Sequence, residues 1–211
     1  MFSLLEKNFT LILKILFLYS CLNLINTLKA NAVVIDFESL QDQEIIDDQF
    51  LDLGVDFNGF ASVLSSSTGS LNSDSFPPFS GNKVAFDDPD LTPGILRIDA
   101  VGREWSMVGA YVTGNRRVTL STYDANGFPL GTIATSGANS VISGADTGLS
   151  PNIFLSLSMN DIAYAIFSHN GNTYTIDNFT FEPESLAITE PSFLWGLISV
   201  VTIGIISRLK V

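Results

Sequence analysis

The chain has 211 residues, of which 46% are hydrophobic, and its 22 acidic residues outnumber its 10 basic residues, giving a formal net charge of −12. Between positions 33 and 188 the imbalance is larger, because 20 acidic residues and only five basic ones leave a charge of −15. Such a surface repels nucleic acid phosphates and anionic membranes and attracts divalent cations, so we predict no nucleic acid partner. This middle part is long enough for one domain with a substantial core.

The amino terminus has the pattern of a secretory signal peptide. An apolar stretch over residues 9–25 follows Lys7, and Ala30 and Ala32 supply the small residues of an A-x-A cleavage site. We therefore predict that residues 1–32 direct the chain to the export machinery and are removed after Ala32. The alternative is an anchor that stays uncleaved in the membrane.

The middle of the chain alternates between short apolar segments and turn residues, which is typical of an all-β domain. A stretch over residues 65–80 that is rich in Ser, Pro and Gly predicts a long loop, and no amphipathic helix is expected. Residues 105–113 carry apolar side chains on both faces, as a central strand does, whereas residues 153–159 alternate between an apolar face and a largely polar one. The predicted strands are 33–37, 55–60, 84–86, 95–100, 105–113, 118–123, 128–134, 153–159, 162–167 and 174–181.

Two pairs of these strands are predicted to form hairpins. Residues 118–134 contain Asn126-Gly127 between two strands, and residues 162–181 contain Asn170-Gly171 in the same place. Frequent turns between short strands favour an all-β fold, namely an antiparallel jelly-roll-like β-sandwich over residues 33–181.

The last residues form a three-part pattern that is typical of a sorting signal. The polar motif Thr189-Glu190-Pro191-Ser192 precedes an apolar run over residues 193–206 and the basic end Arg208-Leu209-Lys210. A transmembrane helix usually needs about 20 apolar residues, and this run is shorter. Because the cations after it can snorkel to the membrane surface and extend it, we predict a transmembrane helix over residues 193–207. A linker over residues 182–188 precedes it, and the cations after the helix place the domain outside the cytoplasm. The alternative is a helix buried in the core of a soluble domain.

This tail resembles the C-terminal signal of the bacterial PEP-CTERM proteins, which has a Pro-Glu-Pro motif, a hydrophobic helix and a basic end. Glu190-Pro191-Ser192 and Trp195-Gly196-Leu197 match that layout, whereas Thr189 stands where the first Pro is expected. The resemblance implies export, processing of residues 189–211 by the membrane protease exosortase, and a location in the cell envelope or outside the cell. It implies no catalytic residues. The middle domain is similar to β-sandwich modules of such proteins through Ile35-Asp36-Phe37-Glu38, Tyr123-Asp124-Ala125-Asn126-Gly127 and Ile176-Asp177-Asn178-Phe179-Thr180-Phe181.

Three acidic residues are candidates for a structural Ca²⁺ site. Asp36 and Glu38 share one face of the first predicted strand, and Asp177 is predicted to share its face with the core residues Phe179 and Phe181. An acid on a core face needs a partner or a metal, and oxygen ligands from distant segments suit Ca²⁺. The alternative is that these carboxylates bond to backbone amides at strand ends.

Nothing in the sequence predicts catalysis. The one histidine, His169, adjoins a predicted turn and is expected to be solvated, and the one cysteine, Cys21, lies in the predicted signal peptide. The mature chain then has no disulfide and no thiolate, and glycine motifs that bind phosphate are missing from the sequence. We predict that the protein is not an enzyme.

Polysaccharide is the predicted ligand class. Aromatic side chains offer flat apolar faces to pyranose rings, although aromatic residues on strands more often belong to the core. Arg116-Arg117 most simply decorates a loop, and a contact with anionic polysaccharide is the alternative for this pair. A structural or protein-interaction role in the cell envelope, without a glycan ligand, is the alternative function. The aromatic candidates are Trp105, Tyr111, Tyr123, Phe128 and Tyr164.

Overall fold

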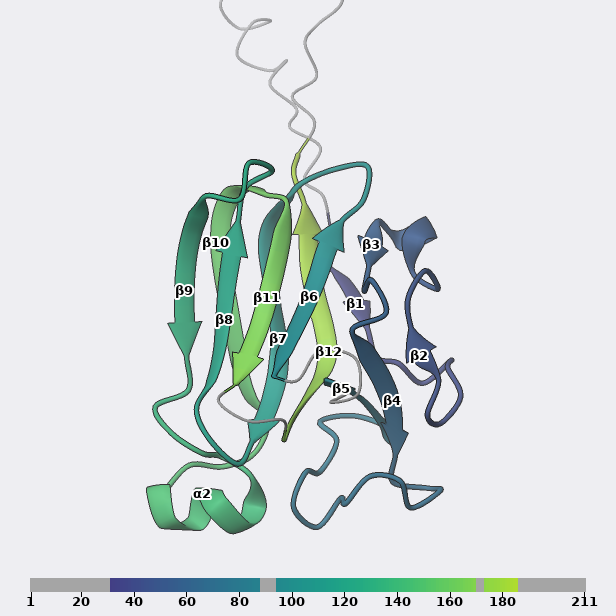
Figure 1. Ribbon diagram of the computed structural model, residues 1–211, viewed down its shortest axis with the longest axis vertical. Coiled ribbons are helices and arrows are strands. Elements are labelled where there is room, and N and C mark those ends of the chain that lie inside the picture. Colours follow the sequence, from purple (N-terminus) through teal and green to yellow (C-terminus); the bar gives the residue numbers. More distant parts are fainter. Residues whose placement is uncertain (1–30, 88–93, 170–172, 186–211) are drawn as a thin grey trace, which may run out of the picture. The chain divides into compact units, whose positions relative to one another are not determined.

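The structure of the protein is a computed structural model (Figure 1) that describes residues 31–87, 94–169 and 173–185. The chain divides into two compact units, and the unit of residues 30–184 contains every strand described below. The described residues do not include Ala30 of the predicted cleavage site, the motif Thr189-Glu190-Pro191-Ser192 or the predicted transmembrane helix over residues 193–207. No helix in the described part of the chain is long and apolar enough to cross a membrane.

The strands form two antiparallel sheets. Sheet A has the order β10-β7-β12-β5-β4-β2, with β1 also paired to β12, and sheet B has the order β3-β6-β11-β8-β9. In Figure 1 sheet B lies in front of sheet A, and residues of both sheets share one core, so the domain is an antiparallel β-sandwich, as predicted; the jelly-roll connectivity stays a prediction. The strands of sheet A are β1 (Val33–Ile35), β2 (Ile45–Ile46), β4 (Ala61–Ser65), β5 (Lys83–Asp87), β7 (Trp105–Gly114), β10 (Ile153–Ile162) and β12 (Tyr174–Pro183). The strands of sheet B are β3 (Val55–Asp56), β6 (Ile95–Ala100), β8 (Val118–Tyr123), β9 (Pro129–Ala134) and β11 (Tyr164–His169).

Aromatic rings dominate the core between the two sheets. The ring of Phe179 lies at the centre of this group and contacts four other rings, with centroids 5.6 to 6.5 Å away. Fully burying one phenylalanine side chain stabilises the fold by roughly 1.5 to 3 kcal/mol. The largest rings that are fully buried are those of Phe37, Phe57, Trp105, Phe167, Tyr174, Phe179 and Phe181.

A bulge in β12 moves Asp177 out of the core. Asp177 pairs with Tyr111 and Thr180 pairs with Gly109, so β12 uses one residue more than β7 over the same interval. The backbone at Asn178 is left-handed, with a φ of 46°. One extra residue reverses the alternation of side chains along a strand. The prediction that Asp177 shares a face with Phe179 and Phe181 is therefore wrong, because Asp177 lies on the outer face of sheet A.

Strand pairing confirms one predicted hairpin and contradicts the other. β8 and β9 form a hairpin, and β7 is central in sheet A, between β10 and β12, as expected. β11, in contrast, pairs with β6 and β8 in sheet B, whereas β12 belongs to sheet A and extends to Pro183. Two alternating strands with a turn between them look alike in a hairpin and in a connection between sheets, so the local pattern does not distinguish the two.

Several elements differ from the sequence pattern. Of the predicted strand over residues 55–60, only residues 55–56 form a strand, β3, because Asn58, with a φ of 56°, ends the extended segment. β4, which belongs to the other sheet, begins at Ala61. β2, the 3₁₀ helix η1 (Leu51–Leu53) and α2 (Val141–Thr147), which the Ser140 hydroxyl caps, have no local signal and were not predicted. A helix of seven residues is too short to show a clear helical period.

Candidate functional site

The outer face of sheet A carries a row of three side chains on adjacent strands. Asp177 of β12 pairs with Tyr111 of β7, and Tyr111 pairs with Phe154 of β10. The segment of residues 66–82, called the 66–82 loop below, contains most of the predicted loop and contacts this row. Asp177 is only 1% exposed although it lies on an outer face, because the 66–82 loop covers it.

Phe79 of the 66–82 loop stacks on this row. Its ring is nearly parallel to that of Tyr111, with centroids 3.4 Å apart and an angle of 8° between the planes. The ring of Phe154 contacts Tyr111 from a centroid distance of 4.9 Å. Phe79 and Phe154 are nevertheless 45% and 42% exposed. Since Tyr111 covers one face of the Phe79 ring, the exposed surface of that ring is its opposite face and its edge. We call Phe79, Tyr111 and Phe154 the aromatic shelf.

The carboxylate of Asp177 holds Phe79, the shelf residue that belongs to the 66–82 loop, in place. Its Oδ2 accepts hydrogen bonds from the N–H groups of Phe79, at 2.7 Å, and Ser80, at 2.9 Å, and its Oδ1 accepts one from Asn178 at 2.7 Å. The Ser80 hydroxyl also donates to Oδ1 of Asn178 at 2.8 Å. Burial, and to a smaller extent the charge of Glu38, raises the pKa of Asp177 to about 6, although the three N–H groups act in the opposite direction.

Glu38 holds the end of the same loop. Its Oε1 accepts hydrogen bonds from the N–H groups of Asn82 and Lys83, at 2.8 and 2.7 Å. The Lys83 ammonium in turn donates to the carbonyl oxygen of Glu38, at 2.7 Å, and to that of Leu40. Gly81 lies between Ser80, which Asp177 holds, and Asn82, which Glu38 holds. Its φ is 56°, and a Cβ atom at this position would lie 2.5 Å from Cδ of Glu38. The loop therefore requires glycine at this position.

The residues predicted to bind Ca²⁺ thus contact backbone amides, as the alternative prediction describes. Asp36 is exposed, and its Oδ1 accepts the N–H of Glu38 at 3.1 Å. Amide hydrogens occupy oxygens of Glu38 and Asp177 that a cation would need. Calcium binding by Asp36, Glu38 and Asp177 stays a prediction. Within the described ranges, the group of three acidic side chains with carboxylate oxygens inside 4.8 Å of one another is Glu104, Asp161 and Glu184.

The aromatic candidates from the sequence fall into three environments. Tyr111 belongs to the shelf, and Trp105 is fully buried in the core. Phe128 is 67% exposed in the turn between β8 and β9. Tyr123 and Tyr164 stack on each other on the outer face of sheet B, with centroids 4.8 Å apart.

Sequence analysis missed the two exposed shelf residues. Phe154 occupies the face of β10 that is otherwise polar, with Ser156 and Ser158, and a large apolar side chain on a solvent face indicates an interaction surface. Phe79 follows Pro77-Pro78 in a loop without periodicity, so no local signal predicts that it stacks on β7.

Two further expectations concern charged or titratable residues. Arg116 and Arg117 are exposed between β7 and β8, in the expected loop. His169 is only 8% exposed and its ring lies 5.6 Å from that of Tyr174, so the expectation of a solvated histidine is wrong. The reason is that β11 extends to His169, which follows the buried residues Ala165 and Phe167 on the inner face.

The chain matches no protein-family model and no curated protein. Its structure is similar to that of a DUF4465 family protein from Bacteroides caccae, with 13% identity, a TM-score of 0.46, and coverage of 73% of this chain and 100% of the other. It is also similar to a family 29 carbohydrate-binding module from Piromyces equi, with 11% identity, a TM-score of 0.33, and coverage of 74% and 91%. Both TM-scores are low, and neither likeness carries weight for the function.

Proposed function

We propose that the protein is an exported, non-catalytic module that binds polysaccharide on the aromatic shelf. The observation that carries this proposal is the position of Phe79, which is 45% exposed while one ring face stacks on Tyr111 and its N–H is held by Asp177. Keeping a buried carboxylate to fix an exposed apolar ring costs folding free energy. Exposed apolar surface that is held in this way is typical of an interaction site.

A pyranose ring fits a shelf of this kind. The C–H groups on one side of the sugar form an apolar face, which is attracted to the negative face of an aromatic ring, while the hydroxyl groups at its edge stay hydrated. The shelf itself carries no charge, but residues 33–188 carry a charge of −15, which repels anionic polysaccharide. We therefore infer that the ligand is neutral. Two partly exposed rings supply only a few kcal/mol, so the Kd of one sugar chain is on the order of 1 mM.

A glycan array incubated with the protein displayed in many copies on beads, so that weak sites act together, tests this proposal. Phe79→Ala removes the outer ring of the shelf, so we expect a weaker signal from the spots that bind the unchanged protein. Phe128→Ala is the matched control, because Phe128 is 67% exposed but lies in the β8–β9 turn. The control variant is expected to bind as before. A blank array for the unchanged protein, or equal loss in both variants, contradicts the proposal.

We also propose that the chain is exported and then processed at its C-terminal signal by exosortase. The sequence patterns of the two ends support this step: Ala30 and Ala32 before the domain, and Thr189-Glu190-Pro191-Ser192 before the apolar run. Mass spectrometry of the mature protein tests both ends at once, with a first residue Val33 and a C-terminus near Ser192 expected. Full-length protein in the cytosol contradicts this part of the proposal.

A cleft with exposed aliphatic side chains in its lining favours the second candidate function, which is protein interaction without a glycan ligand. The cleft has a volume of about 410 Å³, and its lining includes Leu51, Leu53 and Val101, which are 40%, 48% and 37% exposed. If the protein binds a protein partner in this cleft, we expect Leu53→Asp to abolish cross-linking to that partner in envelope extracts and Phe79→Ala to leave it unchanged. A positive glycan array whose signal Phe79→Ala weakens would decide against this alternative.

A further inference from the structure

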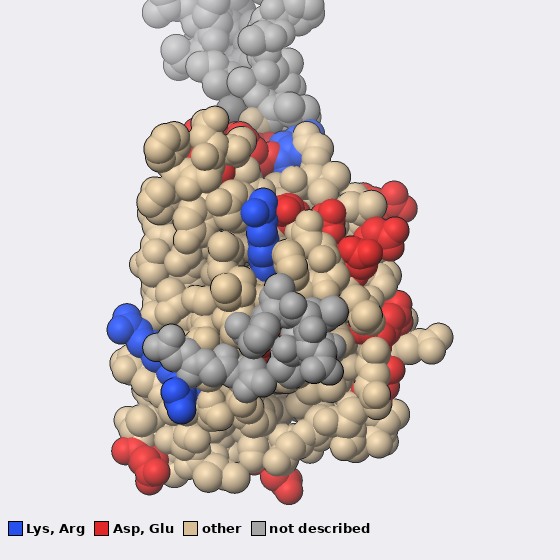
Figure 2. All heavy atoms as spheres, viewed as in Figure 1, with Lys and Arg blue, Asp and Glu red and all other residues tan. Residues whose placement is uncertain are grey.

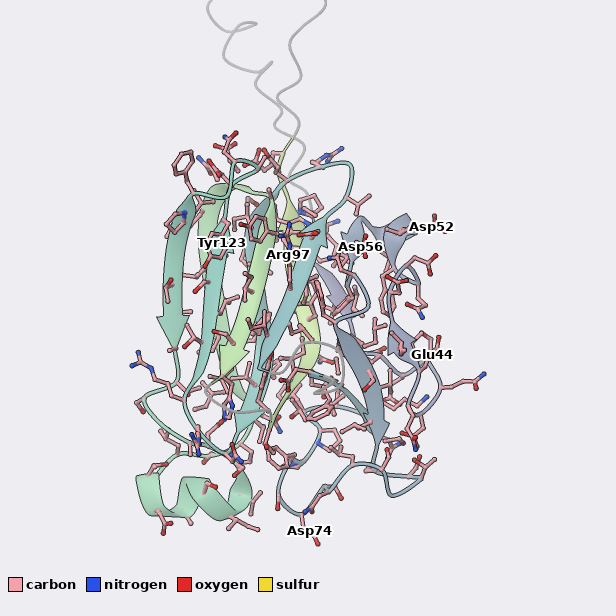
Figure 3. All side chains as sticks on the ribbon, viewed as in Figure 1. Glu44, Asp52, Asp56, Asp74, Arg97 and Tyr123 are labelled. Carbon is pink, nitrogen blue, oxygen red and sulfur yellow. The ribbon has the colours of Figure 1, made fainter. Side chains whose placement is uncertain are left out.

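The outer face of sheet B carries a second row, which combines charged, amide and aromatic side chains. In register across β3, β6, β11 and β8, the neighbouring residues are Asp56, Asp99, Tyr164 and Tyr123. Figure 3 shows Tyr123, Arg97 and Asp56 at similar heights across this face. The set called the sheet B row consists of Asp56, Asn58, Arg97, Asp99, Tyr123 and Tyr164.

Arg97 is fixed in place although it is accessible. Its Nε donates to Oδ1 of Asp99 at 2.7 Å, and its guanidinium carbon lies 3.9 Å from the centre of the Tyr164 ring. The side chain is 42% exposed. In the ranges that the structure describes, the two terminal nitrogens of Arg97 have no hydrogen-bond partner. Their N–H groups are therefore free to donate to a ligand as a planar, pre-oriented pair.

Hydrogen bonds continue from Asp99 to the edge of the sheet. The Asn58 amide donates to Oδ2 of Asp99 at 3.0 Å, and the Asn58 backbone N–H donates to Oδ1 of Asp56 at 2.7 Å. Asn58 has a φ of 56°, which brings its side chain and backbone into this network. Oδ2 of Asp56 has no hydrogen-bond partner among the described residues, so it remains a free acceptor. Such a connected network orients its members before any ligand arrives.

The tyrosines of this row differ from the aromatic shelf. β11 lies between β6 and β8, so Arg97 and Tyr123 approach the Tyr164 ring from opposite sides. Tyr123 and Tyr164 are nearly parallel, with an angle of 9° between their planes. Both faces of Tyr164 are thus covered, and this ring offers its edge rather than an open face.

We propose that the sheet B row binds a second neutral polysaccharide chain through hydrogen bonds, so that one molecule joins two chains. Each sugar hydroxyl both donates and accepts a hydrogen bond, and the row offers the donors of Arg97 beside the acceptors of Asp56 and Asp99. Two carboxylates and one guanidinium leave a negative charge, which repels uronate or sulfate groups. Figure 2 shows that the visible surface over β8 and β9 is largely uncharged and that acidic side chains gather on the side of β2 and β3.

The two sites lie on opposite sides of the sandwich. The aromatic shelf is on the outer face of sheet A, and the sheet B row is on the outer face of sheet B, with the core between them. A short stretch of one sugar chain does not reach both. Linking of two chains rests on the proposed function of the shelf, whereas binding to the sheet B row does not. Two weak sites on one molecule also raise the avidity for a polysaccharide network.

The test uses the full-length chain in a detergent without a sugar headgroup, with hydroxyethyl cellulose, galactomannan and xylan as neutral probes and alginate as the anionic one. Affinity electrophoresis measures binding, and the viscosity of the polysaccharide solution measures linking. We expect Phe79→Ala and Arg97→Ala each to bind a neutral probe without raising its viscosity. Arg97→Lys keeps the charge but not the planar pair of donors. We expect the double variant Phe79→Ala/Arg97→Lys to bind the neutral probe about tenfold or more weakly than Phe79→Ala alone.

Each outcome of this test bears on the proposal. Loss of all binding to the neutral probes in Phe79→Ala overturns it, because the sheet B row is intact in that variant. Wild-type binding and viscosity in both Arg97 variants, or a preference for alginate, also overturn it. Binding by Phe79→Ala together with none by Arg97→Ala supports the sheet B row and refutes the shelf. Because Arg97 is on the surface, circular dichroism is expected to show an unchanged fold.

Discussion

Replacing Asp177 with Asn tests the role of this carboxylate through its pH dependence. The pKa of Asp177 is raised from 3.8 to about 6 in the folded protein, and a difference of roughly two units corresponds to about 3 kcal/mol. Because the folded state binds this proton more tightly than the unfolded state does, ionisation of Asp177 destabilises the fold. The free energy of unfolding of the wild type therefore gains this contribution as the pH falls from about 7 to about 4. Asp177→Asn does not titrate and lacks the gain.

Urea denaturation at several pH values, followed by circular dichroism, measures this effect. The segment 31–185 suits the experiment because the core cluster runs from Ile35 to Phe181 and lies entirely within it. Both proteins share all other carboxylates, so the difference between them isolates Asp177. We subtract the free energy of unfolding of the variant from that of the wild type. This difference is expected to rise by about 2 to 3 kcal/mol as the pH falls from about 7 to about 4. A difference that stays constant or falls over this range refutes the buried, ionised carboxylate.

Three other predictions concern the loop, the core and calcium. Gly81→Ala is expected to lower the free energy of unfolding by about 2 kcal/mol or more, because φ is 56° and the new Cβ meets Glu38. Gly69→Ala is the control, because Gly69 has a φ of 84° but a Cβ there would have no atom within 4 Å. This control should lower the free energy of unfolding by only about 1 kcal/mol. Phe179→Ala removes the central ring of the core and should cost about 3 to 5 kcal/mol in the same assay. If Asp177 binds calcium, excess Ca²⁺ raises the melting temperature, EDTA lowers it, and Asp177→Ala abolishes the difference. An unchanged melting curve with EDTA and with Ca²⁺ argues that Asp177 only holds the loop.

Local sequence patterns predict the all-β class and most strands, because alternation is a property of each strand by itself. The β8–β9 hairpin is also local, since Asn126-Gly127 lies in the short turn between its two strands. Which sheet a strand joins depends on distant partners, and this is why the sequence did not separate β11 from β12. The bulge at Asn178 is equally hidden, because a single left-handed residue inside an alternating stretch leaves the pattern unchanged.

The candidate site could be predicted only in part. Asp177 and Glu38 stand out in the sequence as acids next to apolar residues, which indicates that they need partners. The partners are amides of the 66–82 loop, and their positions depend on how a loop without periodicity folds over sheet A. Tyr111 was a candidate for the same reason as any aromatic residue on a strand. Its contact with Phe79 required the tertiary structure.

The long pairing of β12 with β7 has a mechanical consequence. β12 pairs with β7 from Tyr174 to Pro183 and is the last strand of the described residues. A pull directed along β12 acts perpendicular to its hydrogen bonds. Bonds in this orientation are loaded in shear and must break together, whereas an unzipped hairpin breaks them one at a time. A pull along β12 is thus resisted by the whole ladder between β12 and β7.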